Sequence, residues 1–158
     1  MNKTITKHHI LFIAIGGISL LLITEFAYFV GSIVQQFLIL YKQNPLTTII
    51  INELIRASIF IGSVYFILNK ITKYKELSLE GLKKYLIWLI VLYFLVQGSQ
   101  IVYNLYGLTT SENYTEGLEI YSKYIKENYF ILVLTSVVYY LQLVLFAVII
   151  VNYTIKHD

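Results

Sequence analysis

Four long apolar runs, separated by shorter polar segments, dominate this chain of 158 residues. A helix of about 20 residues is enough to cross the ~30 Å hydrocarbon core of a bilayer, and each run reaches that length. Only 13% of the residues are charged and 58% are hydrophobic, whereas a soluble domain has about 25% and about 45–50%. With so few charges a soluble fold could not cover its apolar surface, so the sequence predicts an integral membrane protein.

The predicted spans cover about 10–41, 47–69, 85–107 and 129–153, and they form a single transmembrane domain over residues 1–158. The first run is longer than one crossing needs, so we expect its helix to tilt or to project beyond the membrane. Pro45, the only proline, interrupts the chain after that run, because proline cannot continue the backbone hydrogen bonds of a helix. The predicted fold class is therefore all-α, an integral membrane four-helix bundle.

The positions of the lysines predict the orientation, because Lys and Arg accumulate on the cytoplasmic side of membrane proteins. The N-terminal segment, the connection 70–84 and the C-terminal tail together carry eight lysines. The other two connections carry three, which are Lys42, Lys123 and Lys126. Both termini are therefore predicted to be cytoplasmic. The use of eleven Lys against one Arg, with abundant Ile and Asn, favours a bacterial cytoplasmic membrane.

The longest connection, 108–128, is predicted to lie outside. Leu118, Tyr121 and Ile125 follow a spacing of i, i+3 and i+7, and charged residues occupy the other faces. This pattern is typical of a short amphipathic helix at a membrane surface. Such a helix could pack on the bundle as part of the fold, or it could cover a bound ligand as a lid.

Charged residues inside a span cost about 2.5–3.5 kcal/mol each on insertion scales, so they require an explanation. Glu53 and Arg56 are separated by three positions and can pair on one helix face. In the predicted orientation the first span runs outward and the second runs inward. Glu25 lies late in the first span and the pair lies early in the second, so all three residues fall in the outer half of the membrane. Polar side chains of the third and fourth spans reach a similar depth. The candidate polar cluster is Glu25, Asn52, Glu53, Arg56, Gln97, Gln100, Asn104, Thr135 and Ser136.

Three interpretations of this polar cluster remain open. It could be a sealed structural core in which polar side chains hydrogen-bond between helices. It could be a water-filled pocket, open to the outside, that binds a small polar ligand or a cation. It could also be an interface with a polar helix of a partner.

The sequence lacks the residues that several kinds of metal, haem and catalytic site require. The chain has no cysteine, and its histidines are His8, His9 and His157, so a span offers no thiolate or imidazole ligand for a metal or haem. No H-E-x-x-H or G-x-x-x-x-G-K-[ST] motif occurs, and no span combines Ser with a His or Lys base. We therefore expect no catalytic residues, no metal and no cofactor, and a protein that is not an enzyme. The net charge of +3 comes from loop lysines and indicates no nucleic-acid partner.

The segment 74–85 reads Tyr-Lys-Glu-Leu-Ser-Leu-Glu-Gly-Leu-Lys-Lys-Tyr and leads into the third span. Together with the four-span layout, it resembles an uncharacterised family of four-helix bacterial membrane proteins of about this size. Members of that family are often encoded beside a small helix-turn-helix regulator. The resemblance implies a regulatory role. The same residues also suit a helix start, with Ser78 as the N-cap.

The expected function is a small non-catalytic membrane protein that acts as a regulatory, sensory or accessory subunit. The expected partners are the lipid bilayer and either another protein or further copies of the chain. Two alternatives remain: an oligomeric channel or carrier for a small solute or cation, and a membrane immunity or defence protein. The candidate cytoplasmic docking face consists of Lys70, Lys73, Lys75, Lys83 and Lys84.

Overall fold

A computed structural model of the chain describes residues 7–75, 78–106 and 111–156, and its regular structure in these ranges is helical. The helices are α1 (Lys7–Leu40), α2 (Pro45–Lys75), α3 (Leu79–Tyr106), α4 (Glu112–Glu127) and α5 (Tyr129–Lys156). Four of them contain stretches long and apolar enough to cross a membrane, namely Lys7–Leu40, Pro45–Ile67, Leu79–Leu105 and Tyr129–Ile149. The predicted all-helical class with four candidate spans is confirmed.

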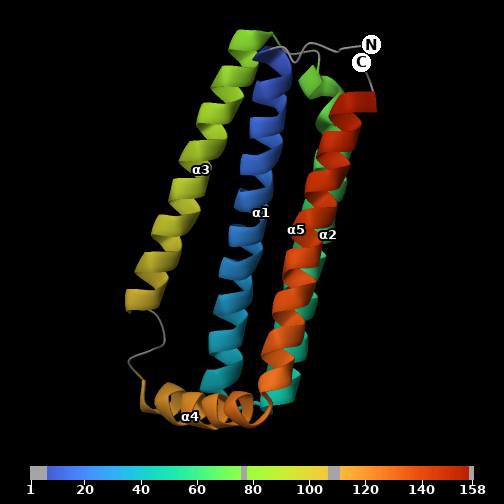
Figure 1. The fold of residues 1–158 in the computed structure, drawn as a ribbon. Helices are drawn as coiled ribbons and strands as arrows, with labels where there is room; N and C mark the ends of the chain where they lie inside the picture. The colour runs from blue at the N-terminus through green and yellow to red at the C-terminus, as the bar shows by residue number, and fades with distance from the viewer. Residues whose placement is uncertain (1–6, 76–77, 107–110, 157–158) are drawn as a thin grey trace.

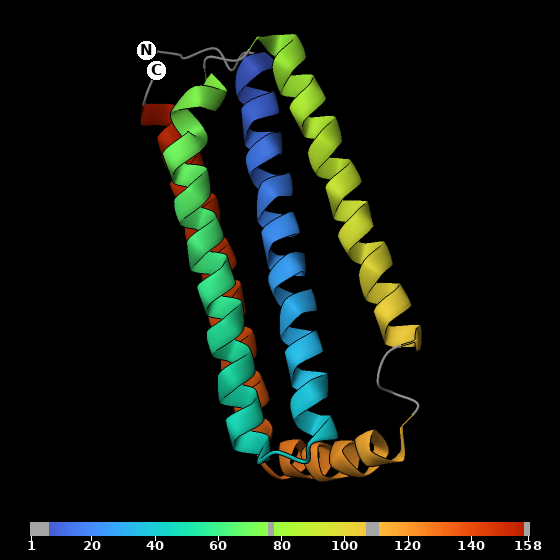
Figure 2. The same cartoon turned by 180° about the vertical axis from the view of Figure 1, so that it is seen from behind.

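The long helix α1 is the centre of the arrangement. It packs against each of the other helices and contributes more buried side chains than any of them. Figures 1 and 2 show α2 and α5 together on one side of α1, with α3 on the other. The start of α1 and the end of α5 lie at the same end of the bundle (Figure 1), as a chain with an even number of spans requires.

The connection between α1 and α2 is a tight turn held by the backbone. Lys42 N–H donates to the Ile39 carbonyl at 2.9 Å and Gln43 N–H to the Leu38 carbonyl at 3.0 Å, which is the pair of bonds of a Schellman motif. Lys42 adopts a left-handed conformation with φ 52°, at a cost of about 1 kcal/mol for a residue with a Cβ. Asn44 then caps α2 by accepting from Leu46 N–H at 2.9 Å, and Pro45 takes the first helical position, where proline is favoured.

The helices α3 and α4 both begin at a serine cap. Ser78 Oγ accepts from Gly81 N–H at 3.2 Å, which confirms the predicted N-cap of the third long helix. Ser111 Oγ accepts from Tyr114 N–H at 3.2 Å. Each serine therefore supplies an acceptor for one of the free N–H groups of the first turn.

The short helix α4 lies across the end of the bundle, at the end opposite the start of α1 (Figures 1 and 2). It approaches α1 so closely that a Cβ added at Gly117 would stand 2.0 Å from the carbonyl oxygen of Ile39. Lys42 and Glu116 form an ion pair on its exposed side. Contacts of α4 with α1, α2 and α5 thus close this end of the molecule.

The third span packs mainly along α1. Its buried residues Leu82 and Leu89 form a cluster with Ile15 of α1. This cluster lies near the start of α3, and towards α4 the two helices diverge (Figures 1 and 2). The core of the molecule is therefore divided, with an apolar contact between α1 and α3 and a separate contact region among α1, α2 and α5.

Large apolar side chains remain exposed along the outer surfaces of the long helices. Leu54, Phe94 and Leu145 are each more than 60% exposed, at 62%, 67% and 62%. In water such a surface would be unfavourable by about 25 cal/mol per Å² of apolar area. The hydrocarbon of a bilayer is the solvent that suits it, and helices are the form in which backbone groups stay bonded there.

We predict that Gly117→Ala destabilises the protein by about 1–3 kcal/mol, because the new methyl group meets the backbone of α1 rather than a movable side chain. The matched control is Gly62→Ala in α2, where a Cβ meets nothing within 4 Å. Thermal unfolding in a mild detergent measures both variants. If both variants unfold at the same temperature as the wild type, α4 is not held against α1 as described.

Candidate functional site

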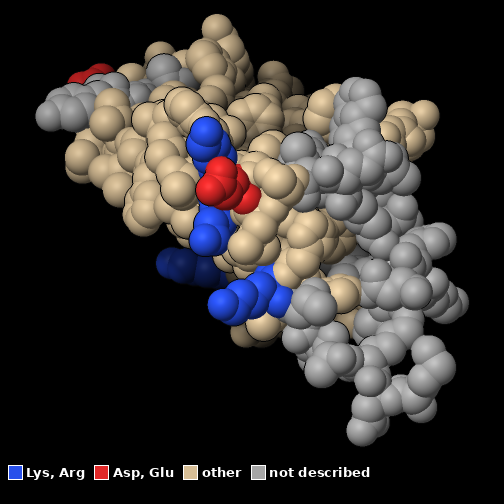
Figure 3. All heavy atoms as spheres, turned by 90° about the horizontal axis from the view of Figure 1, so that it is seen from above, with Lys and Arg blue, Asp and Glu red and all other residues tan. Residues whose placement is uncertain are grey.

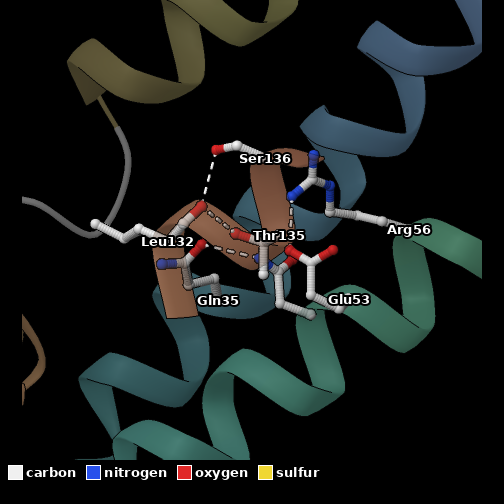
Figure 4. A network of polar contacts seen from close by, with 7 residues as sticks. Gln35, Glu53, Arg56, Leu132, Thr135 and Ser136 are labelled. Carbon is white, nitrogen blue, oxygen red and sulfur yellow. Dashed lines mark hydrogen bonds and ion pairs between the residues drawn. The ribbon is translucent and has the colours of Figure 1, made fainter. Parts of the chain in front are cut away.

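The only arginine of the chain stands between α1, α2 and α5. Its Nη1 donates to Glu53 Oε1 at 2.8 Å, one turn earlier on α2, so the predicted pair is present. The side chains of Arg56 and Glu53 are 21% and 37% exposed. Figure 4 shows both groups directed towards Thr135 and Ser136 of α5. The pair therefore presents charge to the space between helices rather than to the surface of α2 alone.

Residues of α1 support the guanidinium from the other side. The Arg56 guanidinium carbon lies 5.2 Å from the centroid of the Tyr28 ring, a distance typical of a cation–π contact. Gly31 makes room for the arginine stem, because a Cβ at this position would lie 2.8 Å from Arg56 Cγ and 2.5 Å from Asn52 Oδ1. The close approach of α1 and α2 at Gly31 thus holds Arg56 in place.

A polar cavity of about 400 Å³ lies beside this arginine, between α1, α2 and α5. Counted along the helices, its residues on α2 and α5 lie roughly 9–17 Å from the ends that α4 covers. Every lining residue carries a polar side-chain atom. They are Thr24, Glu25, Tyr28, Arg56, Thr135, Ser136, Tyr139 and Tyr140. A cavity of this size matches the smaller ligand pockets of proteins, although such pockets are usually more apolar.

Glu25 lines the cavity together with Arg56 but does not bond to it. Within the described ranges, no hydrogen bond or ion pair involves the Glu25 carboxylate. The predicted proximity of Glu25 and Arg56 is therefore present as a shared cavity, while the ion pair belongs to Glu53. No group of three His, Asp or Glu side chains suited to a metal ion occurs among the residues described.

The polar side chains around the cavity make few bonds between helices. Thr135 and Ser136 both donate to the Leu132 carbonyl of their own helix, at 3.0 and 2.8 Å (Figure 4), and Thr24 donates to Leu20 and Leu21. Among the cluster residues, the side-chain hydrogen bond that links two helices joins Asn52 Nδ2 to Gln35 Oε1 at 3.2 Å. Asn52 Oδ1 is buried without a hydrogen-bond partner. The cluster is therefore poorly connected for a sealed hydrogen-bonded core.

The polar stripe of the third span is not part of this site. Gln97 and Gln100 are half-buried and Asn104 is exposed on α3, on the side of α1 away from α2 and α5 (Figure 2). The prediction that all four spans contribute to one polar core thus requires correction. Depth in the membrane was inferred from residue counts, but packing of α3 along α1 separates this stripe from Arg56.

The structure adds residues that sequence reasoning assigned no role. Tyr28, Tyr139 and Tyr140 line the cavity, and Tyr139 and Tyr140 stack edge to face at 5.5 Å. On α4, burial and then the charges of Glu53 and Tyr28 raise the pKa of Tyr121. The sequence feature that indicates the cavity tyrosines is a recurrence of polar groups four residues apart, at 24 and 28 and at 135, 136, 139 and 140.

The candidate docking face lies at the other end of the molecule. Seen from that end, Lys side chains gather around an acidic residue (Figure 3), and the exposed lysines described there are Lys7, Lys83 and Lys84. The side chains of Lys70, Lys73 and Lys75 lie outside the described residues. This face and the polar cavity are on opposite halves of α1.

The comparisons with known proteins add no relative. No protein-family model, no curated protein and no solved structure matches the chain.

We predict that Arg56→Ala destabilises the protein by about 1–3 kcal/mol, because it leaves the partly buried Glu53 without its partner. The double variant Glu53→Leu with Arg56→Met removes both charges and should be more stable than the single variant. Thermal unfolding in detergent compares them. Equal stability of the two variants would mean that Arg56 and Glu53 face water and gain little from pairing.

We also predict that the contact of α4 weakens in acid. The hydrogen bond and the positive charge of Lys42 lower the pKa of Glu116 from its ordinary value of 4.5. A carboxyl with a lowered pKa in the folded state stabilises above its ordinary pKa, and this contribution is lost as the pH falls through the lowered value. As the pH is lowered from roughly 7 to 3, the unfolding temperature should decline less steeply in Glu116→Gln than in the wild type. Identical pH profiles would contradict the contact.

Proposed function

We propose that the chain is a small integral membrane protein without catalytic activity, which binds a small polar group in the cavity beside Arg56 and acts as a sensory or accessory subunit. In this proposal it crosses a bacterial cytoplasmic membrane four times, with both termini inside. The polar cavity then opens in the outer half, under the amphipathic helix α4. The observation that carries the proposal is the lining of the cavity, in which every residue offers a polar group.

The incomplete bonding of the cluster favours a ligand site over structural polar contacts. Polar groups inside a bundle normally bond to one another across helices, and each such bond contributes about 0.6 kcal/mol in measured cases. Here the hydroxyls of Thr24, Thr135 and Ser136 bond to their own helices. The carboxylate of Glu25 and part of the Arg56 guanidinium are left to face the cavity. A group that brought both donors and acceptors would complete these contacts.

The helix α1 provides a route from the cavity to the cytoplasmic side. It contributes Thr24, Glu25 and Tyr28 to the cavity, and one to three turns earlier it packs against Leu82 and Leu89 of α3. The exposed Lys83 and Lys84 adjoin Leu82. A shift of α1 on binding would therefore move the start of α3, where we place the surface for a cytoplasmic partner. Nothing in the described residues specifically favours the channel, carrier or defence alternatives.

Water access to the cavity tests the proposal. The chain has no cysteine, so single cysteines can be labelled from outside intact cells with a membrane-impermeant thiol reagent. We predict that Thr135→Cys and Ser136→Cys are labelled, at rates that approach that of Glu119→Cys on the exposed surface of α4. Phe94→Cys, on the exposed apolar side of α3, should stay unlabelled.

The same experiment contains its controls. Lys84→Cys should be labelled only after the cells are permeabilised, because the proposed orientation places it inside. Labelling of Lys84→Cys from outside would reverse the orientation. If Thr135→Cys and Ser136→Cys resist labelling in a protein that is folded and labelled at Glu119→Cys, the cavity is sealed and the proposed ligand site is wrong.

A further inference from the structure

An apolar groove continues from the polar cavity along α2 and α5. A second cavity of about 490 Å³ shares Thr24, Arg56, Thr135 and Tyr139 with the polar one. A third, of about 290 Å³, shares Phe60 and Gln142 with the second. The second and third cavities together are called the α2/α5 groove below. The α2/α5 groove is thus a largely apolar space that is continuous with the polar cavity at Arg56.

The dimensions of the α2/α5 groove suit a hydrocarbon chain. Beyond Arg56, its lining on α2 runs from Ala57 to Tyr65, roughly 12 Å of helix, which is comparable to the half of the hydrocarbon core that one acyl chain of a bilayer lipid occupies. Side chains along it, such as Leu54 and Leu145, are well exposed, so the groove opens towards the surrounding bilayer.

The charges where the polar cavity and the groove meet indicate the kind of head group. Glu25, Glu53 and Arg56 together leave one negative charge when all are ionised. Nη1 of Arg56 bonds to Glu53, and the guanidinium has further N–H donors in a planar fork that suits a phosphate. The Glu25 carboxylate lines the same cavity and suits a primary ammonium. A head group with one phosphate and one ammonium satisfies both without adding net charge.

We propose that the site binds a zwitterionic bilayer phospholipid of the phosphatidylethanolamine type, and this inference rests on the proposed function. The phosphate lies at Arg56 and the ammonium at Glu25, with the tyrosines of α1 and α5 around them. One acyl chain lies in the α2/α5 groove, beside Phe60 and Phe146, whose rings meet edge to face at 6.1 Å. The protein would then sense or hold one lipid of the membrane that surrounds it.

Native mass spectrometry of the full chain, released from vesicles of equal parts phosphatidylethanolamine and phosphatidylglycerol, tests this inference. We expect the wild type to retain one lipid, with phosphatidylethanolamine preferred by about tenfold or more, as loss or gain of one charge-assisted contact implies. Glu25→Gln should lose the preference while still retaining a lipid. Glu80→Gln, an exposed acid at the start of α3, is the matched control and should behave like the wild type.

A second variant tests the groove separately from the head group. Ala57 lines the groove on α2, so Ala57→Phe should block the acyl chain and abolish lipid retention, with Gly62→Ala as the control that retains it. A wild type that retains no lipid, retains both lipids equally, or appears as a dimer that Ala57→Phe dissociates would overturn the lipid assignment. In those cases labelling of Thr135→Cys from outside would still support a polar ligand site. Absence of that labelling as well would remove the proposed function.

Discussion

The guanidinium of Arg56 imposes the main physical constraint on this molecule. A charged group within a span is unfavourable unless other groups replace its hydration, and hydrocarbon cannot do so. The structure supplies Glu53 at 2.8 Å and the face of Tyr28 at 5.2 Å. The contacts that remain open on Arg56 face a cavity rather than another helix. The packing of α1, α2 and α5 around this residue therefore leaves space, and that space is the candidate site.

The helix α1 connects the separate parts of the structure. Gly31 lets it approach α2, its end is covered by α4 at Gly117, and its first half packs on Leu82 and Leu89 of α3. The polar cavity lies near its middle. The molecule therefore has an apolar contact region at the proposed cytoplasmic end and a more open region around Arg56. Such a division suits a protein in which binding on one side alters a surface on the other.

Much of the fold followed from the sequence because the bilayer restricts what an apolar run can do. The spans, the cap at Ser78 and the pairing of Glu53 with Arg56 all depend on local spacing, and local spacing can be read directly. Helix boundaries differed by a few residues, since α2 starts at Pro45 and α3 at Leu79, where caps rather than hydropathy determine the ends.

The composition of the site could not be predicted in full, because it depends on which helices are neighbours. Residue counts place Gln97, Gln100 and Arg56 at a similar depth but say nothing about their positions around α1. The structure sets α3 on the far side and brings the α5 residues Tyr139 and Tyr140 to the cavity instead. The α2/α5 groove was likewise absent from the sequence reasoning, since it exists only where two helices are held slightly apart.

The most direct measurement uses the fact that the chain contains a single arginine. Selective ¹⁵N labelling of arginine gives guanidinium NMR signals that belong to Arg56 alone, in the full chain within a lipid nanodisc. We predict inequivalent Nη1 and Nη2 signals, because Nη1 bonds to Glu53, and we predict that the signals shift both in Glu53→Gln and in Tyr28→Leu. Averaged signals that respond to neither substitution would show a guanidinium without fixed contacts to Glu53 or Tyr28, and would contradict the assignment of Arg56 as the group around which the site is built.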